Sequence, residues 1–227
     1  PDGGVTSVAL PADLDVYGTC PGCDAFGYRD DDGDPWAGDY DRDGDLVIEN
    51  QGGSVNLKWT GEDLTFTSIT AFETFERFYE EDTDVSPAKI VHNTYEAEID
   101  QFTQEFRLGG ESGGLNWLAG AYYYDQKTDG AFQIDASGID YIIGDANYDQ
   151  ETKSWSLFGQ LEYALSDYWS VLAGLRYTDE ERELDYLSVD LNGLLPPEAN
   201  TMFAYDDDIS NDNVTGKVEL DWRPTDG

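Results

Sequence analysis

The sequence alternates polar and apolar residues at every second position over several stretches. In the clearest stretch, 214–222, the apolar residues Val218 and Leu220 flank the charged residue Glu219, and the alternation continues in both directions. Successive side chains of a β-strand point to opposite faces, so this pattern gives each strand one apolar and one polar face. Such strands predict an all-β fold whose sheet meets different surroundings on its two faces.

Seven stretches show this pattern, and short and long connections alternate between them. The expected strands cover 53–59, 64–79, 98–108, 115–125, 153–164, 170–186 and 209–223. Tight turns are expected at 60–63, 109–114, 166–169 and 224–227, and long loops at 1–50, 80–97, 126–152 and 187–208. Barrels of the bacterial outer membrane combine short periplasmic turns with long external loops. We therefore expect an acidic external loop region over 1–50 and a β-barrel wall segment over 51–227.

The fold class that these features favour is an antiparallel up-and-down transmembrane β-barrel segment. The alternative is a soluble β-sandwich or solenoid, which also alternates polar and apolar residues. Several expected strands exceed the about 5–6 residues usual in globular proteins. The apolar faces begin or end in aromatic residues, at Trp59, Tyr123, Trp155, Tyr163, Tyr177 and Trp222. Because bacterial barrels have even strand numbers, about seven strands are expected to belong to a larger wall.

The overall charge of the chain limits its partners. The net charge is −37, from 49 acidic and 12 basic residues. Nucleic-acid-binding proteins need basic surfaces, so this class is excluded. The aromatic share of 14% argues against an unstructured acidic chain. The charge suits a solvated surface, cation binding, or divalent bridging to anionic neighbours.

Five segments resemble strands of TonB-dependent outer-membrane receptors, and they occur in the order found in that family. Thr67–Phe72 resembles "TSITAY", Gln104–Leu108 resembles "QELRL", and Leu118–Tyr123 resembles "WVAGLYY". Ala173–Glu180 resembles "AGLRYTDE", and Val214–Asp226 resembles "SGKVGLDWRPTD". Together the segments span roughly 46–227.

The resemblance implies a 22-stranded barrel in the outer membrane of a Gram-negative bacterium. It implies active uptake of a scarce solute, with an iron–siderophore complex as the default cargo and an oligosaccharide or other nutrient next. The implied partners are outer-membrane lipid, the small-molecule ligand, and the TonB complex, reached through a plug domain that this sequence does not show. Two alternatives stay open: a passive porin-like barrel, and a secreted acidic calcium-binding β-domain.

An Asp-rich segment near the N-terminus partly matches a calcium-binding loop. Asp39, Asp41, Asp43 and Asp45 alternate with other residues, and a glycine precedes the last of them. Calcium prefers several carboxylate oxygens at such spacing. Asn50 stands where an EF-hand carries its final glutamate, and no helix pattern flanks the segment. A solvated acidic loop and a calcium site therefore remain the two interpretations, and no cofactor is otherwise required.

Cys20 and Cys23 form a C-x-x-C pair. Such a pair serves as a redox site, as half of a zinc site, or as a local disulfide. The chain has no βαβ context and only one histidine, His92, so a disulfide in an oxidising compartment is favoured. His92 itself is expected in an exposed outer loop, without a role.

The polar faces of the strands carry charges that we expect to line a lumen. They are Lys58, Glu105, Arg107, Glu162, Arg176, Lys217, Glu219 and Asp221. Most are expected to pair across neighbouring strands. The aromatic residues Tyr122, Tyr124, Phe132, Tyr141 and Tyr148 flank the second long loop and either stack on a ligand or anchor that loop. No catalytic motif is present, so we do not expect an enzyme.

Overall fold

The computed structural model describes residues 13–31, 37–196 and 200–223, which contain one sheet of seven strands. The strands are β1 (Asp45–Thr60), β2 (Leu64–Asp82), β3 (His92–Ser112), β4 (Leu115–Asp135), β5 (Ile143–Ser166), β6 (Trp169–Asp190) and β7 (Thr201–Trp222). A short 3-10 turn, η1 (Ser137–Ile139), lies between β4 and β5. Within the described ranges, no helix has the length and apolar character needed to cross a membrane. The expected all-β architecture is confirmed.

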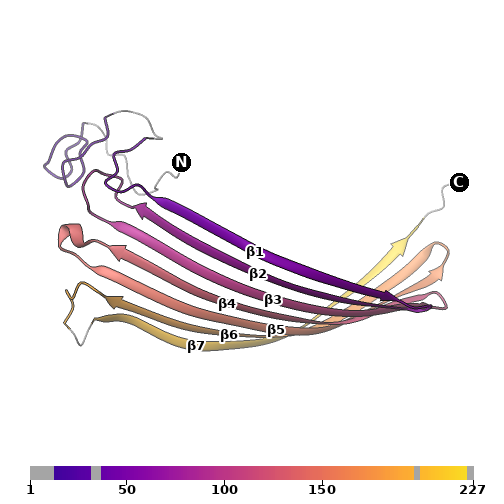
Figure 1. The fold of residues 1–227 in the computed structure, drawn as a ribbon. Helices are drawn as coiled ribbons and strands as arrows, with labels where there is room; N and C mark the ends of the chain where they lie inside the picture. The colour runs from indigo at the N-terminus through magenta and orange to yellow at the C-terminus, as the bar shows by residue number, and fades with distance from the viewer. Residues whose placement is uncertain (1–12, 32–36, 197–199, 224–227) are drawn as a thin grey trace.

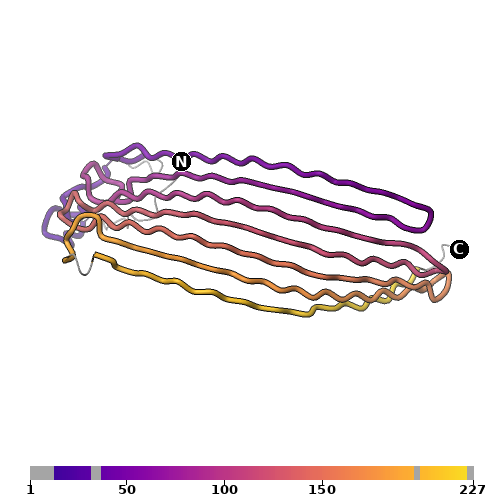
Figure 2. Tube along the Cα trace, turned by 60° about the horizontal axis from the view of Figure 1, so that its bottom comes forward, coloured from indigo at the N-terminus to yellow at the C-terminus, as the bar shows by residue number. Residues whose placement is uncertain are grey.

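The sheet has an up-and-down topology. Each strand pairs antiparallel with its neighbours in sequence, in the spatial order β1-β2-β3-β4-β5-β6-β7. The strands lie side by side in one curved layer, with the N-terminal segment at one end (Figure 1). A second view shows the same regular path back and forth along the strands (Figure 2). We call the end with the N-terminal segment the loop end and the opposite end the turn end.

Tight hairpins close the turn end of the sheet. Gly113 and Gly114 join β3 to β4, and their φ angles are 59° and 82°. Two-residue hairpin turns with positive φ match the twist of the flanking strands, and glycine adopts these angles without strain. The turn expected at 109–114 is therefore in the right place, but strand pairing continues through Ser112 and Leu115.

The strands run further toward the loop end than the sequence pattern indicated. The connections there cover 83–91, 136–142 and 191–200, where loops were predicted at 80–97, 126–152 and 187–208. The predicted loops were too long because the loop-end halves of the strands are rich in Asp and Glu, and their apolar residues, such as Tyr95 and Ile99, lie on the inner face instead of the outward face. For the same reason β1 begins at Asp45, inside the region predicted as loop.

Burial distinguishes the two faces of the sheet. Along β5, Thr152, Ser154 and Ser156 are buried, whereas the residues between them are exposed. We call the more crowded face, to which these three residues belong, the inner face. The other is the outward face. The cross-strand register extends this assignment to all seven strands.

The outward face changes character halfway along the strands. In the turn half, which we call the apolar zone, Leu157, Leu175 and Val218 are 55%, 63% and 80% exposed. This zone covers 55–59, 64–72, 102–110, 117–123, 155–163, 169–177 and 214–222. Contiguous exposed apolar surface of this extent marks an interaction surface.

The loop half of the outward face, which we call the acidic zone, carries a dense array of carboxylates. It covers 45–51, 74–80, 94–100, 125–133, 145–153, 179–189 and 204–212. One register row contains a carboxylate from every strand: Glu49, Glu76, Glu98, Asp129, Asp149, Asp185 and Asp206. We call it the carboxylate row. Like charges directly opposite each other destabilise a sheet, so this row opposes strand pairing.

Candidate functional site

Six aromatic side chains gather on the inner face near the loop end. Tyr79, Tyr95 and Phe132 are register partners on β2, β3 and β4. Their ring centroids are 5.7 Å apart for Tyr79 and Tyr95, and 4.9 Å apart for Tyr95 and Phe132. One inner position nearer the turn end, the register continues the aromatic surface through Tyr148, Tyr186 and Tyr205. We call these two sets the aromatic rows.

A glycine on β4 leaves room for a ring of the second aromatic row. Gly130 on β4 pairs with Tyr148 on β5. A Cβ atom at Gly130 would lie 2.2 Å from Cζ of Tyr148, which is closer than van der Waals contact permits. The Tyr148 ring therefore lies over the bare backbone of β4, beside the row that contains Phe132.

Carboxylates hold several hydroxyl groups of the aromatic rows. The Tyr79 hydroxyl donates to Oε2 of Glu81 at 2.5 Å, and the Tyr205 hydroxyl donates to Oδ2 of Asp207 at 2.6 Å. Burial, and then the charge of Glu81, raise the pKa of Tyr95, so its hydroxyl stays protonated. The arrangement offers flat apolar ring faces with polar edges, which suits stacking against a planar ligand.

The structure places all eight of the predicted lumen charges on the inner face. Their contacts are partly within one strand: Nε of Arg107 lies 2.6 Å from Oε1 of Glu105, two residues away on β3. A cross-strand contact joins Glu162 on β5 to the Ser170 hydroxyl on β6, at 3.3 Å. The guanidinium of Arg176 lies 5.8 Å from the ring centroid of Tyr122, a cation–π distance.

The aromatic residues that the sequence singled out lie in two places. Tyr122, Tyr124, Phe132 and Tyr148 lie on the inner face, whereas Tyr141 lies in the connection after β4 and is 61% exposed. Sequence reasoning missed Tyr79, Tyr95, Tyr186 and Tyr205, because only the cross-strand register brings them beside Phe132 and Tyr148. Their aromatic character was visible, but their proximity was not.

The four aspartates of the predicted calcium loop do not converge into a group. Asp39 accepts a hydrogen bond from the Tyr28 hydroxyl at 3.3 Å, and Asp45 opens β1. Only Asp41 joins a group of three metal-ligating side chains within the described residues, together with Asp82 and His92. Calcium binding by Asp39, Asp41, Asp43 and Asp45 stays a prediction.

His92 differs from its predicted setting. It is the first residue of β3, is 5% exposed, and its Nε2 lies 2.7 Å from Oδ1 of Asp41. The prediction of an exposed loop histidine was wrong because β3 begins earlier than the alternation suggested.

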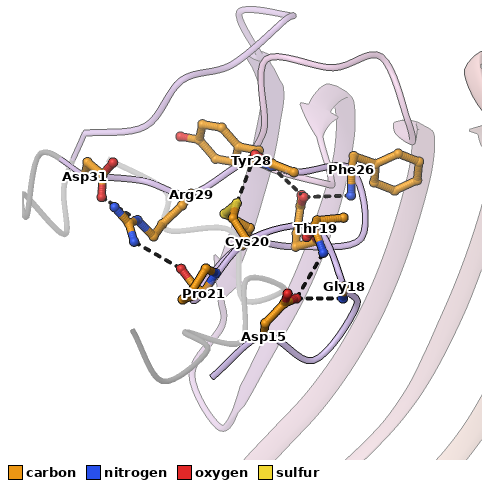
Figure 3. The surroundings of a disulfide bond; sticks show 12 residues. Asp15, Gly18, Thr19, Cys20, Pro21, Phe26, Tyr28, Arg29 and Asp31 are labelled. Atoms are coloured by element: carbon orange, nitrogen blue, oxygen red, sulfur yellow. Dashed lines mark hydrogen bonds and ion pairs between the residues drawn. A yellow bond between two sulfur atoms is a disulfide. The ribbon is translucent and has the colours of Figure 1, made fainter. Parts of the chain in front are cut away.

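Cys20 and Cys23 form a disulfide in the segment before β1 (Figure 3), with their Cα atoms 5.2 Å apart. Local hydrogen bonds fix the surrounding turns. The Asp15 carboxylate accepts from the backbone N–H groups of Gly18 and Thr19, at 2.6 and 3.0 Å, and the Thr19 hydroxyl donates to the Asp24 carbonyl at 2.8 Å. The disulfide therefore closes a compact group of turns at the loop end, which we call the N-terminal turns.

Comparisons with known proteins agree with this architecture. A family model described as "TonB dependent receptor-like, beta-barrel" matches residues 4–227. Among solved structures, the ferric yersiniabactin uptake receptor FyuA from Yersinia pestis is similar, with a TM-score of 0.67 and 16% identity over 80% of this chain and 27% of that one. The siderophore receptor PiuA from Acinetobacter baumannii has a TM-score of 0.58 and 18% identity, over 79% of this chain and 31% of that one.

A third similar structure is the ferric citrate transporter FecA, with a TM-score of 0.54 and 10% identity over 80% of this chain and 26% of that chain. The chain thus spans between about a quarter and a third of the length of these structures. At such identities the likeness concerns the fold. Proteins of the matching family are receptors and transporters of the outer membrane of Gram-negative bacteria, not enzymes.

Proposed function

Because the chain belongs to the family of TonB-dependent receptors, we propose that it forms part of the barrel wall of an outer-membrane receptor that takes up a ferric siderophore. The aromatic rows on the inner face are the observation that carries this proposal. They lie near the loop end, where a solute arriving from outside would first contact the wall.

The two zones of the outward face support a membrane-spanning wall with an external extension. A tilted strand crosses a bilayer with about 9–11 residues, whereas β3 to β7 contain 21 to 24 residues each. The apolar zone occupies roughly the turn half of each strand and suits the lipid. The acidic zone would then stand in water beyond the outer surface, with the N-terminal segment above it.

The chemistry of the aromatic rows supports a planar, partly polar cargo. Stacked aromatic contacts contribute about 0.5–1.5 kcal/mol per pair beyond area burial. Tyrosine hydroxyls held by Glu81 and Asp207 leave ring faces available while keeping polar atoms at the edges. Siderophores combine planar iron-binding groups with polar backbones. Sugars also stack on aromatic rings, so an oligosaccharide is the second cargo to test.

Release of the cargo into the periplasm would need a plug domain and the inner-membrane TonB complex. The inner-face charges, among them Arg107 and Arg176, would then meet carboxylates of the plug, since arginine forms bidentate pairs. Deletion of the TonB partner should abolish uptake but leave binding of the cargo at the cell surface intact.

The test uses the full-length receptor that contains this chain. Its affinity for a panel of catecholate, hydroxamate and citrate ferric complexes, with an oligosaccharide panel beside it, would be measured by isothermal titration calorimetry in detergent. The double variant Tyr148→Ala/Tyr186→Ala should bind the preferred ferric complex about tenfold more weakly, the equivalent of about 1.4 kcal/mol.

The matched control is Tyr148→Phe/Tyr186→Phe, which keeps both rings and should retain most of the affinity. Unchanged binding by the alanine variant would remove the aromatic rows from the ligand site. Binding of oligosaccharides but of no ferric complex would replace the proposed cargo.

A further inference from the structure

Three metal-ligating side chains from three separate segments meet at the loop end. Asp41 precedes β1, Asp82 is the last residue of β2, and His92 is the first residue of β3. Asp82 and His92 are register partners, and by strand alternation they belong to the outward face. The ligand atoms of all three residues lie within 4.8 Å of one another. The cluster is therefore distinct from the aromatic rows on the inner face.

Burial and charge make this cluster unlike the solvated carboxylates elsewhere. Asp82 is 6% exposed and His92 is 5% exposed. Within the described residues, no lysine or arginine forms an ion pair with Asp41 or Asp82. Asp84 adds a further negative charge close to Asp82. Buried charge without a full counter-charge is costly, and a divalent cation would offset it.

Backbone hydrogen bonds orient the buried carboxylate before any ion arrives. Oδ2 of Asp82 accepts from the Asp41 backbone N–H at 3.1 Å, and Oδ1 accepts from the Val85 backbone N–H at 3.1 Å. The first of these bonds also fixes the backbone that carries the Asp41 side chain. The Asp41 carboxylate and the His92 imidazole already touch, with Oδ1 2.7 Å from Nε2. Two atoms that each bind the same ion at about 2.0–2.2 Å lie only slightly further apart than these two do. A small movement of the two side chains would therefore admit the ion.

The donor set selects the class of metal. Calcium and magnesium take oxygen ligands, whereas an imidazole nitrogen combined with carboxylate oxygens suits zinc and other first-row divalent ions. We propose that Asp41, Asp82 and His92 form a site for a divalent transition-metal ion, with water completing the coordination. Such an ion would link the segment before β1 to the β2–β3 connection and hold the N-terminal turns against the sheet.

The proposal is tested on the full-length receptor after chelator treatment and removal of the chelator. Zn²⁺ binding would be measured by competition with a metallochromic indicator, with Ca²⁺ as the comparison ion. The visible spectrum of the Co²⁺ form would report nitrogen and oxygen coordination. The wild type should bind one Zn²⁺ more than the His92→Ala variant does, and that site should lose at least tenfold in affinity in Asp82→Asn.

Asp43→Asn is the matched control, because Asp43 lies two residues from Asp41 but outside the cluster; its Zn²⁺ binding should equal that of the wild type. Correct folding of each variant would be checked by the shift in electrophoretic mobility on heating. Equal Zn²⁺ stoichiometry in wild type and His92→Ala would overturn the site. Displacement of the bound Zn²⁺ by a similar concentration of Ca²⁺, unaffected by His92→Ala, would also overturn it, in favour of an all-oxygen site.

Discussion

The apolar zone and the acidic zone belong to the same face of the same seven strands, yet the sequence pattern predicted strand through the first and only through part of the second. In the apolar zone the outward residues are apolar and the inner ones polar, so the period of two is plain. In the acidic zone the carboxylate row replaces the apolar stripe on the outward face, and apolar and aromatic residues such as Tyr95 and Ile99 lie on the inner face instead. The backbone ladder continues through both zones, with one register shift between β6 and β7 at Ser188 and Val189. The alternation thus depends on the surroundings that each face meets, whereas the strand itself depends on backbone hydrogen bonding.

The largest expected difference between the zones concerns a new charge on the outward face. Leu175→Arg lies in the middle of the apolar zone and should lower the free energy of unfolding by about 2–4 kcal/mol, because the charge would face hydrocarbon. Leu187→Arg places the same side chain in the acidic zone and should change stability little. Both variants of the full-length receptor would be unfolded with denaturant in phospholipid vesicles. Equal losses for the two would show that the acidic zone also lies in lipid.

A smaller difference is expected for two glycines of the inner face. A Cβ at Gly120, in the turn half, would lie 2.7 Å from the Phe106 backbone oxygen and 2.3 Å from the Phe158 ring. Because backbone cannot move aside easily, Gly120→Ala should cost about 1–3 kcal/mol in the free energy of unfolding. At Gly130, in the loop half, the close atoms belong only to the Tyr148 side chain. Gly130→Ala should therefore weaken ligand binding more than stability.

Gly159→Ala is the control for both glycine variants, since its Cβ would meet only the Leu118 backbone oxygen at 3.6 Å. The free energy of unfolding and the ligand dissociation constant would be measured for all three. A Gly130→Ala receptor with unchanged ligand affinity would argue against a ligand role for the Tyr148 ring position.

The smallest expected effect lies within the acidic zone. A hydrogen bond with Asp129, together with the nearby charges of Asp129 and Asp185, raises the pKa of Asp149 above its ordinary value. A carboxylic acid with a raised pKa stabilises the folded state below the usual carboxyl pKa, and this contribution is lost as the pH rises through the raised value. At neutral pH, Asp149→Asn should therefore raise the denaturation midpoint, and the gain should shrink in acid.

Glu151→Gln provides the opposite case two residues away. The hydrogen bond from Lys153 and the charges of Lys153 and Lys127 lower the pKa of Glu151, so its charged form stabilises the sheet and its loss should lower the midpoint. Both midpoints would be compared at low and high salt. If the two variants shifted in the same direction, repulsion along the carboxylate row would not be the cause.

The sequence predicted the fold class, the number of strands and their order, because 214–222 and similar stretches carry a complete pattern. It failed at the loop end for a physical reason. A segment such as Asp206–Asp208 is acidic enough to resemble a solvated loop, although it pairs with β6 residue by residue. Hydrogen bonding between strands does not depend on side-chain polarity, so composition could not reveal it.

The candidate sites were less accessible to sequence reasoning than the fold. Tyr95 and Phe132 lie 37 positions apart, and only the register places their rings in contact. His92 and Asp41 are 51 positions apart, and the early start of β3 brings them together. To predict a site made by cross-strand neighbours, the exact register between the strands has to be known. The alternation shows which face a residue lies on, but not which residue lies opposite it.

The carboxylate row has a consequence for how such a wall enters a membrane. An up-and-down sheet grows by adding neighbouring strands, and in the proposed orientation a wall built from the periplasmic side has to send each acidic half outward past the hydrocarbon. Strand pairing satisfies the backbone during this passage but leaves the side-chain charges exposed, and ionised carboxylates in lipid are costly. The carboxylate row thus opposes insertion of the strands across the membrane, and it opposes their return through the lipid equally. Once outside, seven carboxylates at one level would act as a stop that prevents the strands from sliding back.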